Sequence, residues 1–146
     1  LSPERVEALA LAVQRSLADA DVVCIEDYNK GVCTERVCQG VIRAATRAGK
    51  PVFVDPAKIP DYSRYRGATV MTPNRQEAEL AAGMRTHGEA SVEHNAHVAR
   101  KLLEEVDLDA VVLTLDKHGA LLLAEGGPNE APLATFPSRR FVAASR

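Results

Sequence analysis

Residues 49–58 read GKPVFVDPAK, and this segment decides the fold that the sequence predicts. Val52-Phe53-Val54, at its centre, is a short β-branched and aromatic run that is typical of a buried strand. Gly49 and Pro51 before the run are residues that commonly end a helix, and Asp55-Pro56 after it ends the strand. A helix, a buried strand and a polar turn in direct succession indicate one unit of an α/β fold.

The residues before this segment show the same alternation. Thr34 can cap a helix that ends at Gly49, and residues 22–25 (VVCI) form another short apolar run, bounded by acids. Ser2-Pro3-Glu4 has the composition of a helix start, and apolar residues then recur at helical spacing, so we expect a helix over residues 3–19. Strands separated by helices with short connections indicate right-handed βαβ units and a mostly parallel sheet.

The residues after it continue the pattern. We expect a polar loop at 57–67, a strand at 68–71, a helix from Asn74 to Gly83, a helix capped by Ser91, strands at 111–115 and 120–123 joined as a hairpin, and a surface turn at 125–132. The predicted fold class is therefore α/β, with three layers: a mostly parallel sheet and helices on both faces.

The composition is that of an ordinary folded domain. The chain has 146 residues, of which 46% are hydrophobic and 26% charged, and its formal net charge is −2. A charge so close to zero gives no reason to expect nucleic acid or an anionic membrane as a partner. No apolar run reaches the roughly 18 residues that a membrane span needs.

Cysteine and histidine spacing gives no metal or disulfide pattern. Cys24, Cys33 and Cys38 are odd in number and form no CxxC pair, so we expect reduced, structural thiols in a cytoplasmic protein. His94 and His97 share a predicted helix face, but without a nearby carboxylate or third ligand the sequence favours solvent-exposed histidines over a metal site.

Polar side chains follow the expected strands, where an open parallel sheet binds its ligands. Carboxylates, lysines and an amide at one edge suit a site that handles phosphate and magnesium. No GxxxxGK[ST] or GxGxxG occurs, which disfavours P-loop and dinucleotide-binding proteins. The candidate residues are Glu26, Asp27, Lys30, Asp55, Lys58, Asn74, Glu77, Thr114, Asp116 and Gly119.

Each candidate also has a purely structural interpretation. Asn74 and Glu77 have the spacing of a capping box, although a capped helix N-terminus can also attract phosphate. Lys30-Gly31 can be turn residues, Asp55-Pro56 can end a strand in an Asx turn, and Lys58 can lie on a solvated surface. Their joint placement at one edge favours the functional interpretation.

Four segments together resemble the ribokinase-type (PfkB) carbohydrate kinases. They are DYNKG (27–31), GKPVFVDPAK (49–58), YRGATVMTPNRQE (65–77) and VVLTLDKHGALLL (111–123). The resemblance extends over about residues 1–136 and is strongest to the branch that phosphorylates D-glycero-D-manno-heptose 7-phosphate in ADP-heptose synthesis for lipopolysaccharide. It implies a ribokinase-like fold and phosphoryl transfer from ATP, with Mg²⁺, to a sugar hydroxyl.

The resemblance also implies roles for individual residues. Asn74-Arg75-Gln76-Glu77 matches the N-x-x-E segment that borders the nucleotide phosphates, where Glu77 would organise magnesium through water. Thr114 and Gly119 match the T-x-x-x-x-G segment that lies against the nucleotide. The remaining positions line the phosphoryl-transfer cleft, on the nucleotide side for Asp55 and Lys58 and on the substrate side for Asp27 and Lys30.

The catalytic base of the family does not occur in these residues. The family carries it as the Asp of a GAGD motif shortly after P-[ST]-R; Phe136-Pro137-Ser138-Arg139 matches that approach, but residues 140–146 (RFVAASR) depart from it. We therefore expect residues 1–146 to be the central and nucleotide-side part of a kinase domain, without the N-terminal sugar and lid part, and inactive alone. A fragment, a frameshift product and a degenerate copy all fit this pattern.

The partners implied are small molecules, a sugar phosphate and ATP, and the intact protein would be a cytoplasmic homodimer. Two alternatives stay open at this point. One is a different sugar kinase of the same family. The other, which the missing base favours, is a non-catalytic α/β module that binds nucleotide or a partner without turnover.

Overall fold

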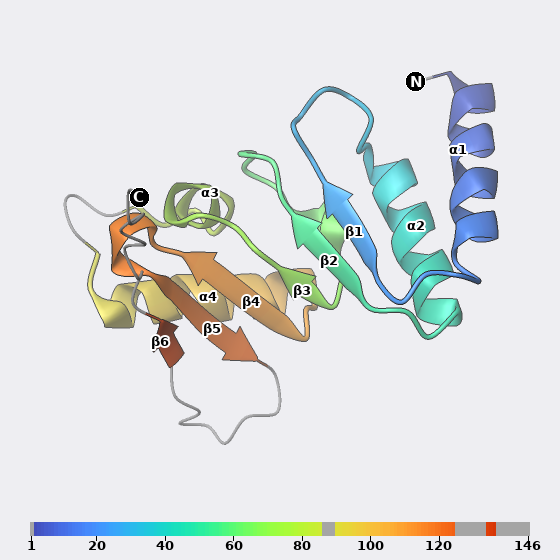
Figure 1. Cartoon of the computed structure of the whole chain (residues 1–146). Coiled ribbons are helices and arrows are strands. Elements are labelled where there is room, and N and C mark those ends of the chain that lie inside the picture. The colour runs from blue at the N-terminus through green and yellow to red at the C-terminus, as the bar shows by residue number, and fades with distance from the viewer. Residues whose placement is uncertain (1, 86–89, 125–133, 137–146) are drawn as a thin grey trace, which may run out of the picture.

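The computed structural model describes residues 2–85, 90–124 and 134–136. The surface turn expected at 125–132 and the segment from Pro137 to Arg146 lie outside the described residues. The elements in chain order (Figure 1) are α1 (Pro3–Ser16), β1 (Val23–Glu26), α2 (Glu35–Arg47), β2 (Val52–Asp55), the 3-10 helix η1 (Ser63–Tyr65), β3 (Val70–Met71), α3 (Arg75–Ala81), α4 (Val92–Val106), β4 (Ala110–Thr114), the 3-10 helix η2 (Asp116–His118), β5 (Ala120–Ala124) and β6 (Ala134–Phe136).

The strands form one sheet in the order β1-β2-β3-β4-β5-β6. Strands β1 to β4 are parallel, whereas β5 is antiparallel to both β4 and β6. The mostly parallel α/β sheet and the β4–β5 hairpin are thus confirmed. Because β1 to β4 run in one direction, they end along one side of the sheet, which we call the carboxyl edge.

One face of the sheet carries the hydrophobic core. The strand registers align Ile25 with Val54, Val54 with Met71, and Met71 with Val111, and all four side chains are buried. Helices α2 and α4 contact the sheet, and α4 lies behind it in Figure 1. Right-handed crossovers between strands laid down in sequential order place their helices on the same face.

The opposite face is less covered by the described residues. Cys24 pairs in register with Phe53 on this face; Cys24 is exposed, and Phe53 is 42% exposed. The described helices that contact the central strands therefore supply one helical layer of the expected three-layer arrangement.

The loop at 57–67 differs from the polar loop expected from the sequence. It contains η1 and two buried tyrosines, Tyr62 and Tyr65, whose exposed fractions are 3% and 0%. Their rings pack edge to face, with centroids 5.5 Å apart. The prediction was wrong because the polar neighbours of these rings in the sequence concealed a segment that packs into the core.

The local helix signals are mostly confirmed. Thr34 Oγ1 accepts a hydrogen bond from the Val37 amide at 3.4 Å, and Ser91 Oγ accepts one from the His94 amide at 3.1 Å. Ser2 precedes α1 without a side-chain capping bond, and α1 ends at Ser16, earlier than expected.

The cysteine and histidine predictions need two corrections. Cys38 is buried and Cys33 half-buried, but Cys24 is exposed, because its strand position faces the less covered side of the sheet. His97 is exposed as expected, whereas His94 is partly buried and its Nε2 lies 3.2 Å from Glu79 Oε1.

Two features are absent from the described residues. No group of three or more residues that could hold a metal ion was found among them. None of their helices is long and apolar enough to cross a membrane.

Candidate functional site

The candidate residues belong to the carboxyl edge because each lies at the end of a parallel strand or in the segment that follows it. Glu26 and Asp55, the last residues of β1 and β2, are partners in the strand register. Asn74 and Thr114 form a further parallel bridge, in which the Thr114 amide donates to the Pro73 carbonyl at 2.9 Å. The structure therefore brings together the ends of all four predicted segments.

The N-terminus of α3 is closed by a complete capping box. Asn74 Oδ1 accepts a hydrogen bond from the Glu77 amide at 3.0 Å, and Glu77 Oε2 accepts one from the Asn74 amide at 2.8 Å. The structural interpretation of this pair is thus confirmed. It does not exclude the functional one, since a carboxylate has two oxygens and this bond engages Oε2.

Lys58 connects the segment after β2 to the first turn of α3. Its Nζ donates a hydrogen bond to Gln76 Oε1 at 3.0 Å. Nearby, Thr72 Oγ1 donates to Asp55 Oδ1 at 3.5 Å. An ammonium group and two carboxylates of the predicted site, those of Asp55 and Glu77, therefore belong to connected segments.

The turn between β4 and β5 forms the other side of the site. Asp116 and Gly119 have positive φ angles of 51° and 93°, and the Leu115 amide donates to the Gly119 carbonyl at 2.8 Å. The φ of Gly119 with ψ of −135° is a conformation that L side chains avoid, which explains a glycine there. Thr114, at the end of β4, is exposed.

A cavity of about 490 Å³ lies beside this turn. Arg75 and Asn95 line it together with the η2 turn, so it opens between the N-termini of α3 and α4 and the β4–β5 connection. Asn95 is only 6% exposed, and its Oδ1 is one of two buried side-chain oxygens without a hydrogen-bond partner in the described part of the chain.

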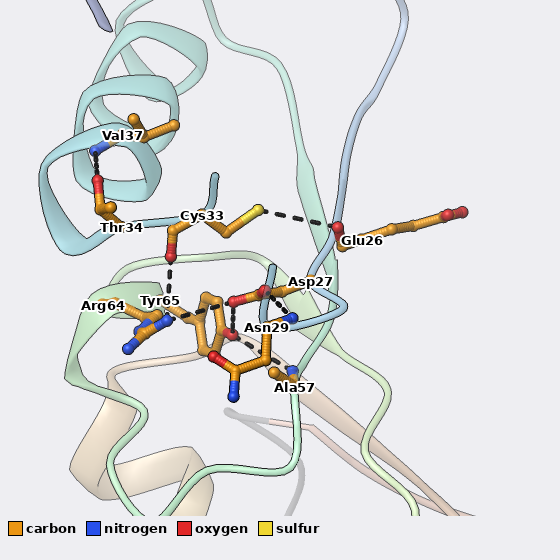
Figure 2. A network of polar contacts seen from close by, with 9 residues as sticks. All are labelled: Glu26, Asp27, Asn29, Cys33, Thr34, Val37, Ala57, Arg64 and Tyr65. Carbon is orange, nitrogen blue, oxygen red and sulfur yellow. Dashed lines mark hydrogen bonds and ion pairs between the residues drawn. The ribbon is translucent and has the colours of Figure 1, made fainter. Parts of the chain in front are cut away.

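Asp27 lies at the centre of a buried polar network, shown in Figure 2. Its Oδ2 accepts a hydrogen bond from the Tyr65 hydroxyl at 2.6 Å and lies 3.4 Å from Arg64 Nη1. Its Oδ1 accepts one from the Asn29 amide at 2.7 Å. The side chain of Asp27 is 2% exposed, so its carboxylate faces the protein and not the solvent.

Lys30 lies in the turn that Asp27 organises. Lys30 is exposed, and its neighbours Asn29 and Gly31 have positive φ angles of 54° and 82°. The turn interpretation of Lys30-Gly31 is therefore confirmed, and a functional role of Lys30 stays a prediction.

Sequence reasoning did not select Tyr65 as a site residue, although it lies in the quoted segment YRGATVMTPNRQE. Its hydroxyl donates to Asp27 and accepts a hydrogen bond from the Ala57 amide at 3.3 Å. Burial, followed by the bond to Asp27, raises the pKa of Tyr65. The one sequence signal for it was an aromatic residue inside a polar loop, which is also typical of a surface tyrosine.

The sheet, with four parallel strands followed by an antiparallel hairpin, has the ribokinase-like α/β fold. Solved structures with this fold include ribokinase from Giardia lamblia, with a TM-score of 0.69 at 16% identity over 94% of this chain and 40% of that one. Another is Arabidopsis thaliana ribokinase complexed with ribose and ATP, with a TM-score of 0.62 at 19% identity over 88% of this chain and 37% of that one.

The sequence pattern of the pfkB family of carbohydrate kinases matches residues 2–142, and the chain belongs to this family. Similar curated proteins include the bifunctional protein HldE of Desulfatibacillum aliphaticivorans, which is 37% identical over 97% of this chain and 28% of its own length. The bifunctional protein HldE of Shewanella piezotolerans is 45% identical over 80% of this chain and 23% of its own length. The chain thus spans about a quarter of these relatives.

Proposed function

We propose that this chain is part of an ATP-dependent kinase that phosphorylates a sugar phosphate, with D-glycero-D-manno-heptose 7-phosphate as the substrate and ADP-heptose synthesis for lipopolysaccharide as its role. The observation that carries the proposal is the meeting of all four motif segments at one carboxyl edge. The similarity to proteins named bifunctional protein HldE supports the heptose branch over other sugar kinases.

The side chains at this edge fit the chemistry of magnesium and phosphate. Asp55 and Glu77 supply carboxylate oxygens, and Asn74 supplies an amide oxygen, which are the donors that Mg²⁺ accepts. When bound, Mg²⁺ would neutralise the charge that develops on the transferred phosphoryl group.

In this proposal the chain's own residues bind and orient the reactants. Glu77 would hold magnesium through water, using the carboxylate oxygen that does not cap α3, and Asn74-Arg75-Gln76 would border the nucleotide phosphates. Lys58, held by Gln76, and Lys30, held in the turn after β1, place positive charge beside phosphate groups. Thr114 and Gly119 line the nucleotide.

We also propose that residues 1–146 form the central and nucleotide-side part of a longer kinase domain. The catalytic base would lie beyond Arg146, and an N-terminal sugar-binding and lid part would mediate homodimer formation in the cytoplasm. The chain covers 40% of Giardia lamblia ribokinase, and Phe53 is exposed on the less covered face of the sheet. Both observations support this arrangement.

The test is a kinase assay on the full-length gene product with ATP–Mg²⁺ and a panel of sugars, following ADP release. We expect turnover with heptose 7-phosphate and little with ribose or fructose 6-phosphate. Preference for another sugar would refute the heptose assignment. The 146-residue chain is the matched control, and turnover by it alone would refute the proposal that its catalytic base lies outside.

A non-catalytic nucleotide-binding module is the second candidate, because no G-x-G-D occurs in the chain. Calorimetric titration of the full-length gene product with ATP–Mg²⁺ separates the two. Binding without ADP release for any sugar in the panel would favour the module.

A further inference from the structure

A single hydroxyl group joins the two loops that carry the lysines of the site. The Tyr65 hydroxyl donates to Asp27 Oδ2 at 2.6 Å and accepts from the Ala57 amide at 3.3 Å. Asp27 opens the turn that contains Lys30, and Ala57 precedes Lys58. Tyr65 is 0% exposed, so these bonds form where water does not compete for them.

The carboxylate of Asp27 is fully engaged inside the protein. Asn29 occupies Oδ1, and Tyr65 and Arg64 occupy Oδ2. Because the side chain of Asp27 is only 2% exposed, its carboxylate is not accessible to a substrate in this structure. Any influence that it has on a ligand must pass through the groups that it holds, and the first of these is the left-handed Asn29 that sets the turn before Lys30.

The network is anchored on both sides. Arg64 Nη1 also donates to the Cys33 carbonyl at 3.0 Å, at the end of the loop that precedes α2. Gln39 Nε2 of α2 donates to the carbonyls of Arg64 and Arg66 at 3.2 and 2.9 Å, which fastens η1 to that helix. Tyr65 is therefore held in place by its neighbours, and its hydroxyl bonds to both loops (Figure 2).

The contacts continue to the nucleotide side of the proposed site. Lys58, one residue after Ala57, donates to Gln76 Oε1 in the first turn of α3. A line of hydrogen bonds thus runs from the Lys30 turn through Asp27 and Tyr65 to Ala57, and from the adjacent Lys58 to α3. A shift in the middle of this line changes the relative positions of its two lysines.

We propose that Asp27 and Tyr65 are positioning residues, which touch no reactant but set the spacing between Lys30 and Lys58 and so the affinity for a phosphorylated ligand. The identity of that ligand rests on the proposed function. The spacing itself does not, because it follows from the hydrogen bonds of the Tyr65 hydroxyl.

The chain contains a matched control for this proposal. Tyr62 lies against Tyr65, is 3% exposed, and its hydroxyl has no hydrogen-bond partner among the described residues. Tyr62→Phe and Tyr65→Phe therefore remove the same atom from neighbouring buried rings, and only the second removes bonds to the two loops.

The first measurement is hydrogen–deuterium exchange of the 146-residue chain. We expect Tyr65→Phe to accelerate exchange of the Asn29 and Ala57 amides at least about tenfold. The Ala57 amide loses its acceptor, and Asp27, whose Oδ1 accepts from the Asn29 amide, loses the Tyr65 bond that holds its carboxylate in place. Tyr62→Phe should change neither amide. Unchanged exchange at both amides in Tyr65→Phe would overturn the proposal, whatever the protein phosphorylates.

The second measurement separates positioning from general stability. In the full-length gene product, Tyr65→Phe should raise KM for the sugar phosphate about tenfold or more, because a displacement near 1 Å can cost that much, with a smaller change in kcat. Kinetic parameters equal to those of Tyr62→Phe would overturn the positioning role. If Tyr65→Phe does not fold, Arg64→Gln is used instead, because Arg64 bonds to Asp27 and to the Cys33 carbonyl. It should accelerate amide exchange in residues 27–34 but not at Ala57, and unchanged exchange in residues 27–34 would overturn the proposal.

No turnover by the unmodified full-length protein with any sugar phosphate would be a failure of the proposed function. The exchange experiment would still decide whether Tyr65 couples the two loops.

Discussion

The capping box of α3 allows structural and catalytic roles of one carboxylate to be separated. Asn74 and Glu77 each accept a hydrogen bond from the backbone amide of the other, at 3.0 and 2.8 Å. Asn74→Ala removes one of these bonds and leaves the carboxylate. Glu77→Gln keeps an oxygen that can accept from the Asn74 amide but removes the charge that magnesium requires.

The two variants should differ in opposite directions for stability and for catalysis. Loss of the Asn74 cap should cost about 1 kcal/mol of unfolding free energy. Glu77→Gln should cost about 0.3–1 kcal/mol, from the lost interaction of a charge with the helix dipole. For a chain of this size, 1 kcal/mol corresponds to about 2–4 °C in Tm.

The expected catalytic effect of Glu77→Gln is larger. Removing a group that orients a metal ion commonly costs about 10–100-fold in activity or metal affinity. At about 1.4 kcal/mol per tenfold, the upper value corresponds to about 2.8 kcal/mol, which exceeds the stability cost.

The assay combines urea unfolding of both variants in the 146-residue chain with kinase activity against Mg²⁺ concentration in the full-length gene product. We expect Glu77→Gln to be as stable as Asn74→Ala or more stable, yet to need much more Mg²⁺ and to have a lower kcat. If Glu77→Gln kept the wild-type Mg²⁺ dependence, Glu77 would be a capping residue only, and the proposed metal role would be refuted.

Three further results are expected for the 146-residue chain. At pH 8 an aromatic disulfide reagent should react rapidly with one thiol of the folded chain, that of Cys24, and with all three thiols in urea. Burial raises the pKa of Cys33 and raises that of Cys38 to about 12, so both thiols stay protonated in the folded chain. Three fast thiols in the folded chain would contradict this. Phe53→Glu should reduce self-association in gel filtration without changing circular dichroism, since Phe53 is 42% exposed on the less covered face; unchanged elution of an associating chain would count against that face as the contact. Leu113→Ala should lower the unfolding free energy by about 2–5 kcal/mol and Leu11→Ala by much less, because their exposed fractions are 0% and 48%; equal losses in urea unfolding would contradict the assigned core.

Local signals in the sequence predicted local structure well. The caps at Thr34, Asn74 and Ser91 depend on atoms three residues apart, so spacing alone predicts them. The strand at Val52-Phe53-Val54 and the turn at Gly119 likewise follow from residue type. Errors at this level were shifts of one to three residues at the ends of elements, where helices fray and definitions differ, and β6, which was not predicted.

Contacts between distant segments were not predictable in the same way. The Tyr65 hydroxyl and Asp27 are 38 positions apart, and nothing in either segment indicates their bond. Asp27 was therefore predicted to line the cleft, whereas its carboxylate is buried, and Tyr65 was assigned to a polar loop. That the segment of Asp27 lines the phosphoryl-transfer cleft stays a prediction. The carboxylate of Asp27 itself interacts with Asn29, Tyr65 and Arg64 inside the protein.

The sequence by itself determined the α/β alternation, the helix ends and the set of polar residues that follow the parallel strands, because each depends on periodicity or on neighbours within one turn. The tertiary structure alone decided the strand order, the single face covered by α2 and α4, and which polar groups are turned inward at Asp27 and Tyr65. Those features depend on which segments pack together, and packing free energy is a property of the contacts between segments and not of any one of them.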